Sequence, residues 1–188
     1  MEIGEMCRPA SRAEWRAWLE AHHASAIEIW LVSRKPAALA AVSYLDSVEE
    51  ALCFGWIDGI GKSLGAEESA QRFTPRRPRS NWTELNKARA RRLIALGLMT
   101  DAGRAVLPDL DAPFRLLPEV ERALRADPGT WATFTSFPPL YQRVRAGYVQ
   151  EMRGSVDEFA TRLANLVTRT AQGQMFGNWN DGGRLDDE

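Results

Sequence analysis

The sequence predicts an α+β protein: a small antiparallel sheet of about three strands packed on helices, followed by a helical C-terminal region. Strand-like runs rich in β-branched and aromatic residues occur only in the first half of the chain. After the Pro-rich stretch 108–118, apolar residues recur at helical spacing. Hydrophobic residues make up 45% of the 188 residues and include seven Trp. That apolar surface is enough for a buried core.

The Pro-rich stretch, PDLDAPFRLLP, is also the expected domain boundary. We expect an α+β domain over residues 1–107, a linker over 108–118, a helical region over 119–171 and a tail over 172–188. The tail is rich in Gly and ends in acidic residues, so we expect it to be mobile unless Phe176 and Trp179 dock it.

Capping signals begin two helices near the N-terminus. Ser11 and Glu14 form a capping box before an amphipathic stretch, whose Trp15 and Trp18 we expect in the core. Ser43 begins a second helix, which ends at the next glycine along the chain.

Three runs predict the sheet. Residues 27–33, IEIWLVS, form one strand, and residues 57–64 and 69–74 form a hairpin whose turn contains Gly65. Two prolines keep the following loop, residues 75–79, out of regular structure, because each removes a backbone donor.

The next helix carries an arginine on its apolar side. Ser80 or Asn81 is expected to cap this helix, which runs to Leu96. Helical spacing places Arg89 on the apolar stripe, where a guanidinium needs a carboxylate or another anion as partner. Asp58 is the nearest candidate by motif.

Further helices are expected downstream. They cover residues 100–107, 119–125, 131–137, 140–151 and 156–171, the last begun by a capping box at Ser155.

Positive charge is concentrated in one segment. Eight Lys or Arg and a single acid lie between residues 72 and 92, in a chain with 24 basic and 25 acidic residues. Such a patch attracts anions. The candidate ligand-binding residues are Trp56, Asp58, Arg72, Arg76, Arg77, Arg79, Trp82, Asn86, Lys87 and Arg89. The alternative is that these arginines pair with acids of the same chain and brace the hairpin against the next helix.

The residues do not assemble an enzyme or a metal site. The two cysteines lack disulfide or metal-ligand spacing, and Cys53 reads as a buried small hydrophobe. His22 and His23 are adjacent and diverge on a helix, and so do Glu49 and Glu50, which we expect to be solvated. We therefore predict no catalytic residue, no metal and no cofactor.

Four motifs, LCFGWIDG, RFTPRR, SNWTELNK and GLMTDAG, occur in this order. Through them the chain resembles the bacterial family of bacteriocin-protection, YdeI/OmpD-associated proteins, from about Trp15 to Gly103 and more loosely through Arg169. The resemblance implies tolerance of bacteriocins or antimicrobial peptides, and it brings no catalytic residues. Family members are often described as periplasmic or linked to an outer-membrane porin. The last helix departs from the family, with VDEFATRLANLVTRT in place of a Lys-rich segment.

Three functions remain open. The first is a non-enzymatic stress-tolerance protein that binds an anionic ligand or a protein partner through the Arg-rich loop. The second is an enzyme acting on a small phosphorylated or carboxylated metabolite, with Asp58 as acid or base. The third, less favoured, is weak nucleic-acid binding. The N-terminus lacks the pattern of an export signal and no run of about 18 apolar residues occurs, so we expect a cytoplasmic protein without membrane insertion.

Overall fold

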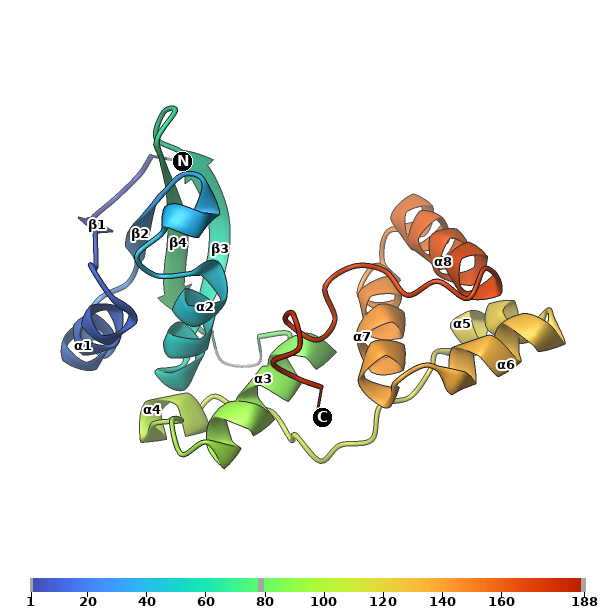
Figure 1. Cartoon of the computed structure of the whole chain (residues 1–188). Helices are drawn as coiled ribbons and strands as arrows, with labels where there is room; N and C mark the ends of the chain where they lie inside the picture. The colour runs from blue at the N-terminus through green and yellow to red at the C-terminus, as the bar shows by residue number, and fades with distance from the viewer. Residues whose placement is uncertain (1, 78–79, 187–188) are drawn as a thin grey trace. The chain divides into compact units, whose positions relative to one another are not determined.

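The computed structural model describes residues 2–77 and 80–186. These residues form helices and one small mixed sheet, so the predicted α+β class is confirmed (Figure 1). Contacts between Cα atoms divide the chain into two compact units. We name Met1–Ser80 with Leu93–Pro108 the α+β unit, and Asn81–Arg92 with Asp109–Glu188 the helical unit.

The sheet of the α+β unit has the strand order β1-β2-β4-β3. Its strands are β1 (Met6–Cys7), β2 (Ile29–Arg34), β3 (Trp56–Ser63) and β4 (Glu68–Pro75). The predicted hairpin is β3 with β4, and β2 pairs antiparallel with β4. The sequence did not reveal β1, a two-residue strand parallel to β2, because two residues carry no periodicity.

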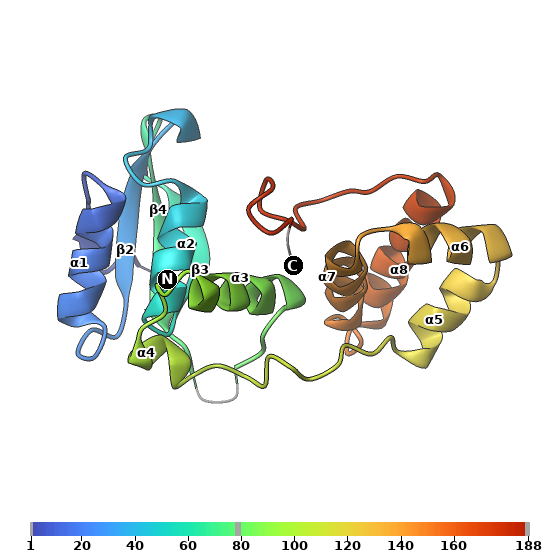
Figure 2. The ribbon, with the colours of Figure 1, turned by 60° about the horizontal axis from the view of Figure 1, so that its bottom comes forward.

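Helices α1 (Arg12–His22) and α2 (Tyr44–Cys53) cover one face of the sheet (Figures 1 and 2). Both predicted caps are confirmed: the Ser11 side chain accepts a hydrogen bond from the Glu14 backbone N–H, and the Ser43 side chain accepts one from that of Asp46. Trp15 is fully buried, with its ring centroid 5.4 Å from that of Phe73 on β4.

The rest of the α+β unit consists of a short 3-10 helix, Ala37–Leu39, the end of α3 (Glu84–Ala95) and α4 (Asp101–Arg104). The fourth helix is shorter than the expected 100–107. Its cap is Thr100, whose hydroxyl also donates to the carbonyl of Cys53 at 2.6 Å.

Two acidic residues of α2 correct the sequence prediction. Glu49 and Glu50 are 2% and 3% exposed, whereas we expected them in solvent. Both pair with Arg12 of α1, and Glu50 also pairs with Arg16 at 2.7 Å. The second predicted core Trp of α1, Trp18, is half-buried.

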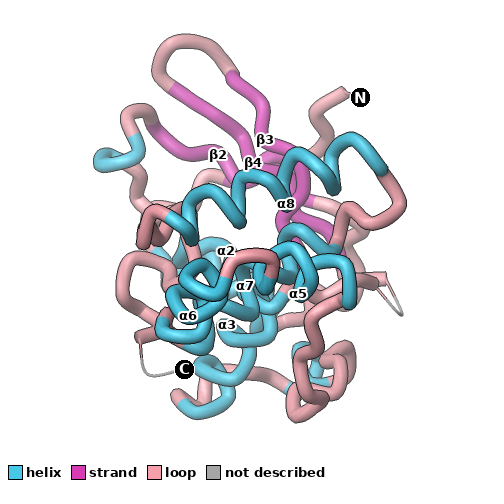
Figure 3. Tube along the Cα trace, turned by 90° about the vertical axis from the view of Figure 1, so that its right-hand side faces the viewer, coloured by secondary structure: helices cyan, strands magenta, loops and turns pink. Residues whose placement is uncertain are grey.

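The regular segments of the helical unit, within its described residues, are all helices (Figure 3). They are the first part of α3, α5 (Pro118–Arg125), α6 (Pro128–Ser136), α7 (Pro139–Gln150) and α8 (Val156–Ala171). Its core contains the buried side chains of Val120, Leu124, Phe134, Val149 and Leu166.

Two predicted helix starts need correction. Neither Ser80 nor Asn81 caps α3; the hydroxyl of Thr83 does, by accepting a hydrogen bond from the Asn86 backbone N–H at 3.1 Å. A cap must directly precede the first helical residue for its oxygen to reach the third N–H, and α3 begins at residue 84. The helix α8 begins where expected, but the Ser155 side chain makes no capping hydrogen bond.

The tail packs on the helices of its unit through Phe176 and Trp179, the two aromatic residues that were expected to dock it. Phe176 packs against the core of the unit, and Trp179 packs against a smaller cluster that includes Leu140 and Leu185. Both rings meet Tyr141 edge-on.

None of the helices within the described residues is long and apolar enough to cross a membrane.

Candidate functional site

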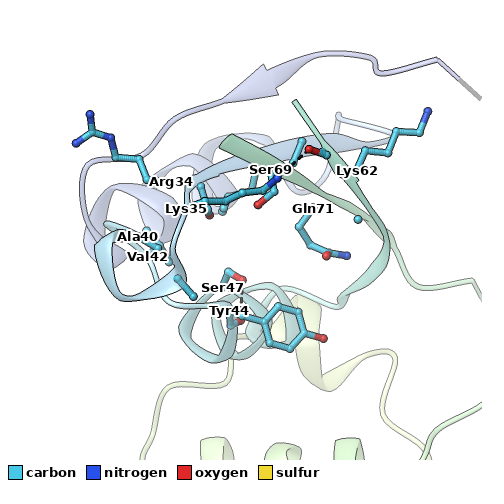
Figure 4. A pocket seen from close by; sticks show the side chains of 15 residues that line it. Arg34, Lys35, Ala40, Val42, Tyr44, Ser47, Lys62, Ser69 and Gln71 are labelled. Carbon is cyan, nitrogen blue, oxygen red and sulfur yellow. Dashed lines mark hydrogen bonds between the residues drawn. The ribbon is translucent and has the colours of Figure 1, made fainter. Parts of the chain in front are cut away.

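A cavity of about 330 Å³ opens in the α+β unit between the sheet and the start of α2 (Figure 4). Its floor comes from β2, β3 and β4, and its walls from α2 and the segment around residues 37–42. The volume lies at the lower end of the range for small-molecule sites.

Strand register builds the polar floor. Ser33, Ser69 and Ser63 pair across β2, β4 and β3 and form one row, and Leu31, Gln71 and Gly61 form the next row. Side chains two residues apart on a strand share a face, so both rows face the cavity. The hydroxyls of Ser33 and Ser69 make no hydrogen bond within the described part of the chain.

A bulge in β3 decides which side chains face the cavity. Asp58 pairs with Phe73, but Gly61 pairs with Gln71, so β3 contains one extra residue there. An extra residue reverses the alternation beyond it. Lys62 is therefore turned to the opposite face, where its ammonium lies 5.7 Å from the ring centroid of Trp30.

Lys35 supplies the positive charge of the cavity. Its ammonium donates to the Ser63 hydroxyl at 2.8 Å and to the Gly65 carbonyl at 3.1 Å. An ammonium has three donors, so one N–H remains for a ligand. Figure 4 shows Lys35 along the rim, whereas Arg34 and Lys62 point outward.

The remaining lining is uncharged. Leu31, Ala37, Ala40 and Val42 are apolar, and none of the described residues that line the cavity is acidic. An ammonium beside hydroxyl donors, without a competing carboxylate, favours an anionic group. The apolar wall favours a ligand whose anionic group is attached to a short hydrocarbon body.

Three of the predicted site residues lie together in the α+β unit. Asp58 accepts a hydrogen bond from the Tyr44 hydroxyl at 2.7 Å. Arg76 is 6% exposed, and this burial lowers the pKa of its guanidinium to about 10 although the charge of Asp58 opposes the shift. Trp56 is a core residue whose indole N–H donates to the carbonyl of His23.

Arg72 and Arg77, which also belong to this unit, do not join that cluster. Arg72 forms an ion pair with Glu28, with its Nε 2.9 Å from the carboxylate. This ion pair supports the alternative in which the basic segment is neutralised within the chain. Arg77 is exposed, and Arg79 lies outside the described residues.

The last four predicted site residues belong to the helical unit. Arg89 is buried as expected, but its partner is Asp181, at 2.6 and 2.8 Å, and not Asp58. Asn86 accepts a further hydrogen bond from Arg89, and Lys87 pairs with Glu84, also on α3. The fourth residue is Trp82, which is half-buried. The predicted residues thus fall into two groups, one in each unit.

Sequence reasoning missed the cavity. Alternation along β2 places Leu31 and Ser33 on one side, and Lys35 follows directly after the strand, so this signal was available. The contribution of β3 could not be predicted, because the bulge turns Ser63 toward the cavity and the local sequence does not reveal the bulge.

The described residues contain no group of three His, Cys, Asp or Glu that could hold a metal ion. Cys53 is fully buried, and burial raises the pKa of its thiol to about 11. It is therefore protonated at neutral pH and unsuited to nucleophilic attack.

Comparison with known families also divides the chain into two parts, one matched by each of two family models. Residues 7–106 match a domain of unknown function, DUF8412, over more than half of the chain, and the protein belongs to that family. Residues 114–173 match the family described as Bacteriocin-protection, YdeI or OmpD-Associated. No curated protein and no solved structure matches the chain.

The resemblance inferred from the sequence is confirmed, but the family match covers a different part of the chain from the one expected. The four motifs that suggested it lie in or before residue 103, within the DUF8412 match. The YdeI/OmpD-associated match lies instead in the helical unit, where the resemblance was expected to be looser.

Proposed function

We propose that the protein is a non-enzymatic tolerance protein that binds a small anionic ligand in the cavity of its α+β unit. The observation that carries the proposal is the position of Lys35 over a floor of serine hydroxyls, in a cavity lined by no acidic residue. The match of residues 114–173 to a family named for bacteriocin protection supports the biological role.

The ligand inferred for this cavity is a carboxylate or phosphate on a short apolar body. Lys35 supplies one charged donor, and Ser33 and Ser69 supply two hydroxyls. Hydrogen bonds to an ionised group are about twice as strong as neutral ones, so the anion should provide the orientation. The wall that contains Val42 supplies apolar contact.

A survival assay tests the tolerance role. A susceptible bacterium expressing the wild-type chain should survive nisin, a cationic bacteriocin, better than cells with an empty vector. Lys35→Met should lose this protection. Lys62→Met is the matched control, because it removes the same charge from the opposite face. Equal survival with wild-type chain and empty vector would contradict the tolerance role; equal protection by both variants would contradict the role of the cavity.

The second candidate is an enzyme acting on a small phosphorylated or carboxylated metabolite. The arrangement that favours it is Asp58, which accepts from Tyr44 while Arg76 lies buried close by. Asp58 would act as acid or base and Arg76 would hold the anion. Turnover of a panel of phosphate and carboxylate esters that disappears in Asp58→Asn would favour this candidate; absence of turnover in the wild-type chain would remove it.

Weak nucleic-acid binding receives less support. The ion pairs of Arg72, Lys87 and Arg89 neutralise part of the basic segment within the chain. A duplex is bound mainly through several phosphates at once, which requires cations that are available together.

A further inference from the structure

A second cavity, of about 350 Å³, lies in the helical unit and is lined by a buried arginine. Arg145 of α7 is 8% exposed, and within the described residues it has no carboxylate partner. The only hydrogen bond of its guanidinium there is a long one, 3.4 Å, to the carbonyl of Phe176. Its Nε is buried without a hydrogen-bond partner.

This environment is unusual for a guanidinium. Arg89, in the same unit, is buried to a similar degree but is satisfied by Asp181 and Asn86. Arg145 has instead the rings of Tyr148 and Phe176, whose centroids lie 4.9 and 4.6 Å from its central carbon. Aromatic faces attract a cation but replace little of its lost hydration. Accordingly, burial lowers the pKa of Arg145.

The chain keeps space for this side chain. Gly177 has a φ of +69°, and a Cβ at this position would lie 2.1 Å from Nη1 of Arg145. A larger residue would displace the guanidinium. The backbone of the tail is thus shaped to leave Arg145 where it lines the cavity.

The other charged groups of the cavity are carboxylates. Glu84 and Glu151 line it together with Arg145. Glu84 is paired with Lys87, whereas Glu151 has no ion pair within the described residues. Two acids beside one arginine disfavour a polyanion such as a nucleotide. They favour a ligand that carries one negative and one positive group.

We propose that this cavity binds a small zwitterion, specifically a free amino acid with an apolar side chain. The carboxylate of the ligand pairs with Arg145, and its ammonium faces Glu151. Its side chain lies against Leu85 and Val144, which complete the apolar lining. This site lies in the helical unit and is independent of the anion site proposed for the α+β unit.

Calorimetric titration of the full chain with three related compounds tests the proposal. L-leucine carries both charges, 4-methylpentanoate lacks the ammonium and 3-methylbutylamine lacks the carboxylate. We expect L-leucine to bind most tightly, and each truncated compound to bind at least about tenfold more weakly, because each loses one charged contact. No heat of binding from L-leucine at up to about 10 mM, or equal affinities for all three, would overturn the proposal.

Two variants assign the contacts. Arg145→Met should weaken L-leucine binding at least about tenfold and leave the amine unaffected, whereas Glu151→Gln should weaken L-leucine and leave 4-methylpentanoate unaffected. Arg125→Met, at an exposed arginine of α5, is the matched control and should bind like wild type. Because no described carboxylate pairs with Arg145, its loss strands no buried charge, and circular dichroism should show a folded chain. Unchanged L-leucine affinity in a folded Arg145→Met would contradict the assignment.

Discussion

Arg89 and Asp181 form the most completely buried ion pair described in the helical unit. Their side chains are 7% and 1% exposed, and two parallel hydrogen bonds join them. Burial alone would raise the pKa of Asp181, but the hydrogen bonds and charge of Arg89 outweigh it and lower that pKa. The pair holds the tail on α3, because Asp181 lies beyond the last helix.

Removing one partner should be costly. Arg89→Ala leaves the Asp181 carboxylate buried without its cation, so we expect a loss of roughly 3–5 kcal/mol in the free energy of unfolding. The double variant Arg89→Met with Asp181→Asn strands no charge and should lose much less, because asparagine tolerates the positive φ of 52° at position 181. Urea denaturation of the three proteins measures both effects. A double variant as unstable as Arg89→Ala would contradict the account.

The same pair predicts a stability loss in acid. A carboxylate with a lowered folded pKa stabilises the protein at pH values above its unfolded pKa of about 3.9, and this contribution is lost as pH falls through the folded value. Wild-type stability should therefore fall below about pH 4 more steeply than that of the double variant. Thermal melting between pH 7 and 2 measures the difference; parallel curves would argue against the linkage.

Both cysteines should resist modification in the folded protein. Burial raises the pKa of the Cys7 thiol to about 11, with a further contribution from Glu5, and burial likewise raises that of Cys53 to about 11. At pH 8 only about one thiol in a thousand is then ionised. Absorbance with Ellman's reagent should show little reaction until a denaturant is added, when two thiols react. Rapid labelling of the native chain would contradict the raised pKa of these two thiols.

The sequence predicted single residues better than their partners. Helical spacing placed Arg89 on the buried side of α3, and the structure agrees. Its partner lies 92 residues away, in a tail without periodicity, so no local pattern could reveal it. Glu49 and Glu50 were wrongly expected in solvent for the same reason. The arginines that neutralise these buried carboxylates lie on another helix.

At the scale of elements, close packing joins α4 to the end of α2. A Cβ on Gly103 would lie 2.2 Å from the backbone oxygen of Cys53, which cannot yield as a flexible side chain does. Thr100 donates to the same carbonyl, so the two helices are fixed at this point.

Gly103→Ala should therefore destabilise the α+β unit, by about 1–3 kcal/mol as for other overpacked sites. The matched control is Gly154→Ala, where nothing lies within 4 Å of the added methyl. That substitution should be neutral or slightly stabilising, because it reduces the entropy of the unfolded chain. Chemical denaturation distinguishes the two, and equal midpoints would show that the contact is not rigid.

Elements with strong local signals were predicted well. The capping residues of α1 and α2, the β3–β4 hairpin and the bounds of α8 all follow from patterns within a few residues. The strand β1 is defined by its pairing with β2, and the bulge in β3 is defined by the register of β3 against β4. Pairing between distant residues decided these features, and with them the floor of the cavity.

For the whole molecule, the domain boundaries expected from composition remain a prediction. Contacts assign Asn81–Arg92 to the helical unit, although these residues precede the Pro-rich stretch. Composition marks where the chain is irregular, whereas packing decides to which unit a helix belongs. Leu85 and Ala88 of α3 pack with Leu140 and Val144 of α7, a contact that local sequence does not encode.

Whole-molecule charge predicts weak attraction to nucleic acid. The chain has 24 basic and 25 acidic residues, and the ion pairs described above occupy part of the basic segment. We expect duplex DNA binding, measured by fluorescence anisotropy, to be sequence-independent at low salt and to vanish near physiological salt. Tight binding that persists at physiological salt and is lost in Arg76→Glu with Arg77→Glu would instead favour a nucleic-acid function.

The central claim, that the cavity of the α+β unit binds a small anion through Lys35, is tested most directly by NMR. Backbone amide spectra of the full chain would be titrated with isobutyrate and, separately, with inorganic phosphate. We predict saturable shifts centred on Ser33, Ser63 and Ser69, which disappear in Lys35→Met and persist in Lys62→Met. Shifts that survive in Lys35→Met, or that are absent from these serines in the wild-type chain, would contradict the claim.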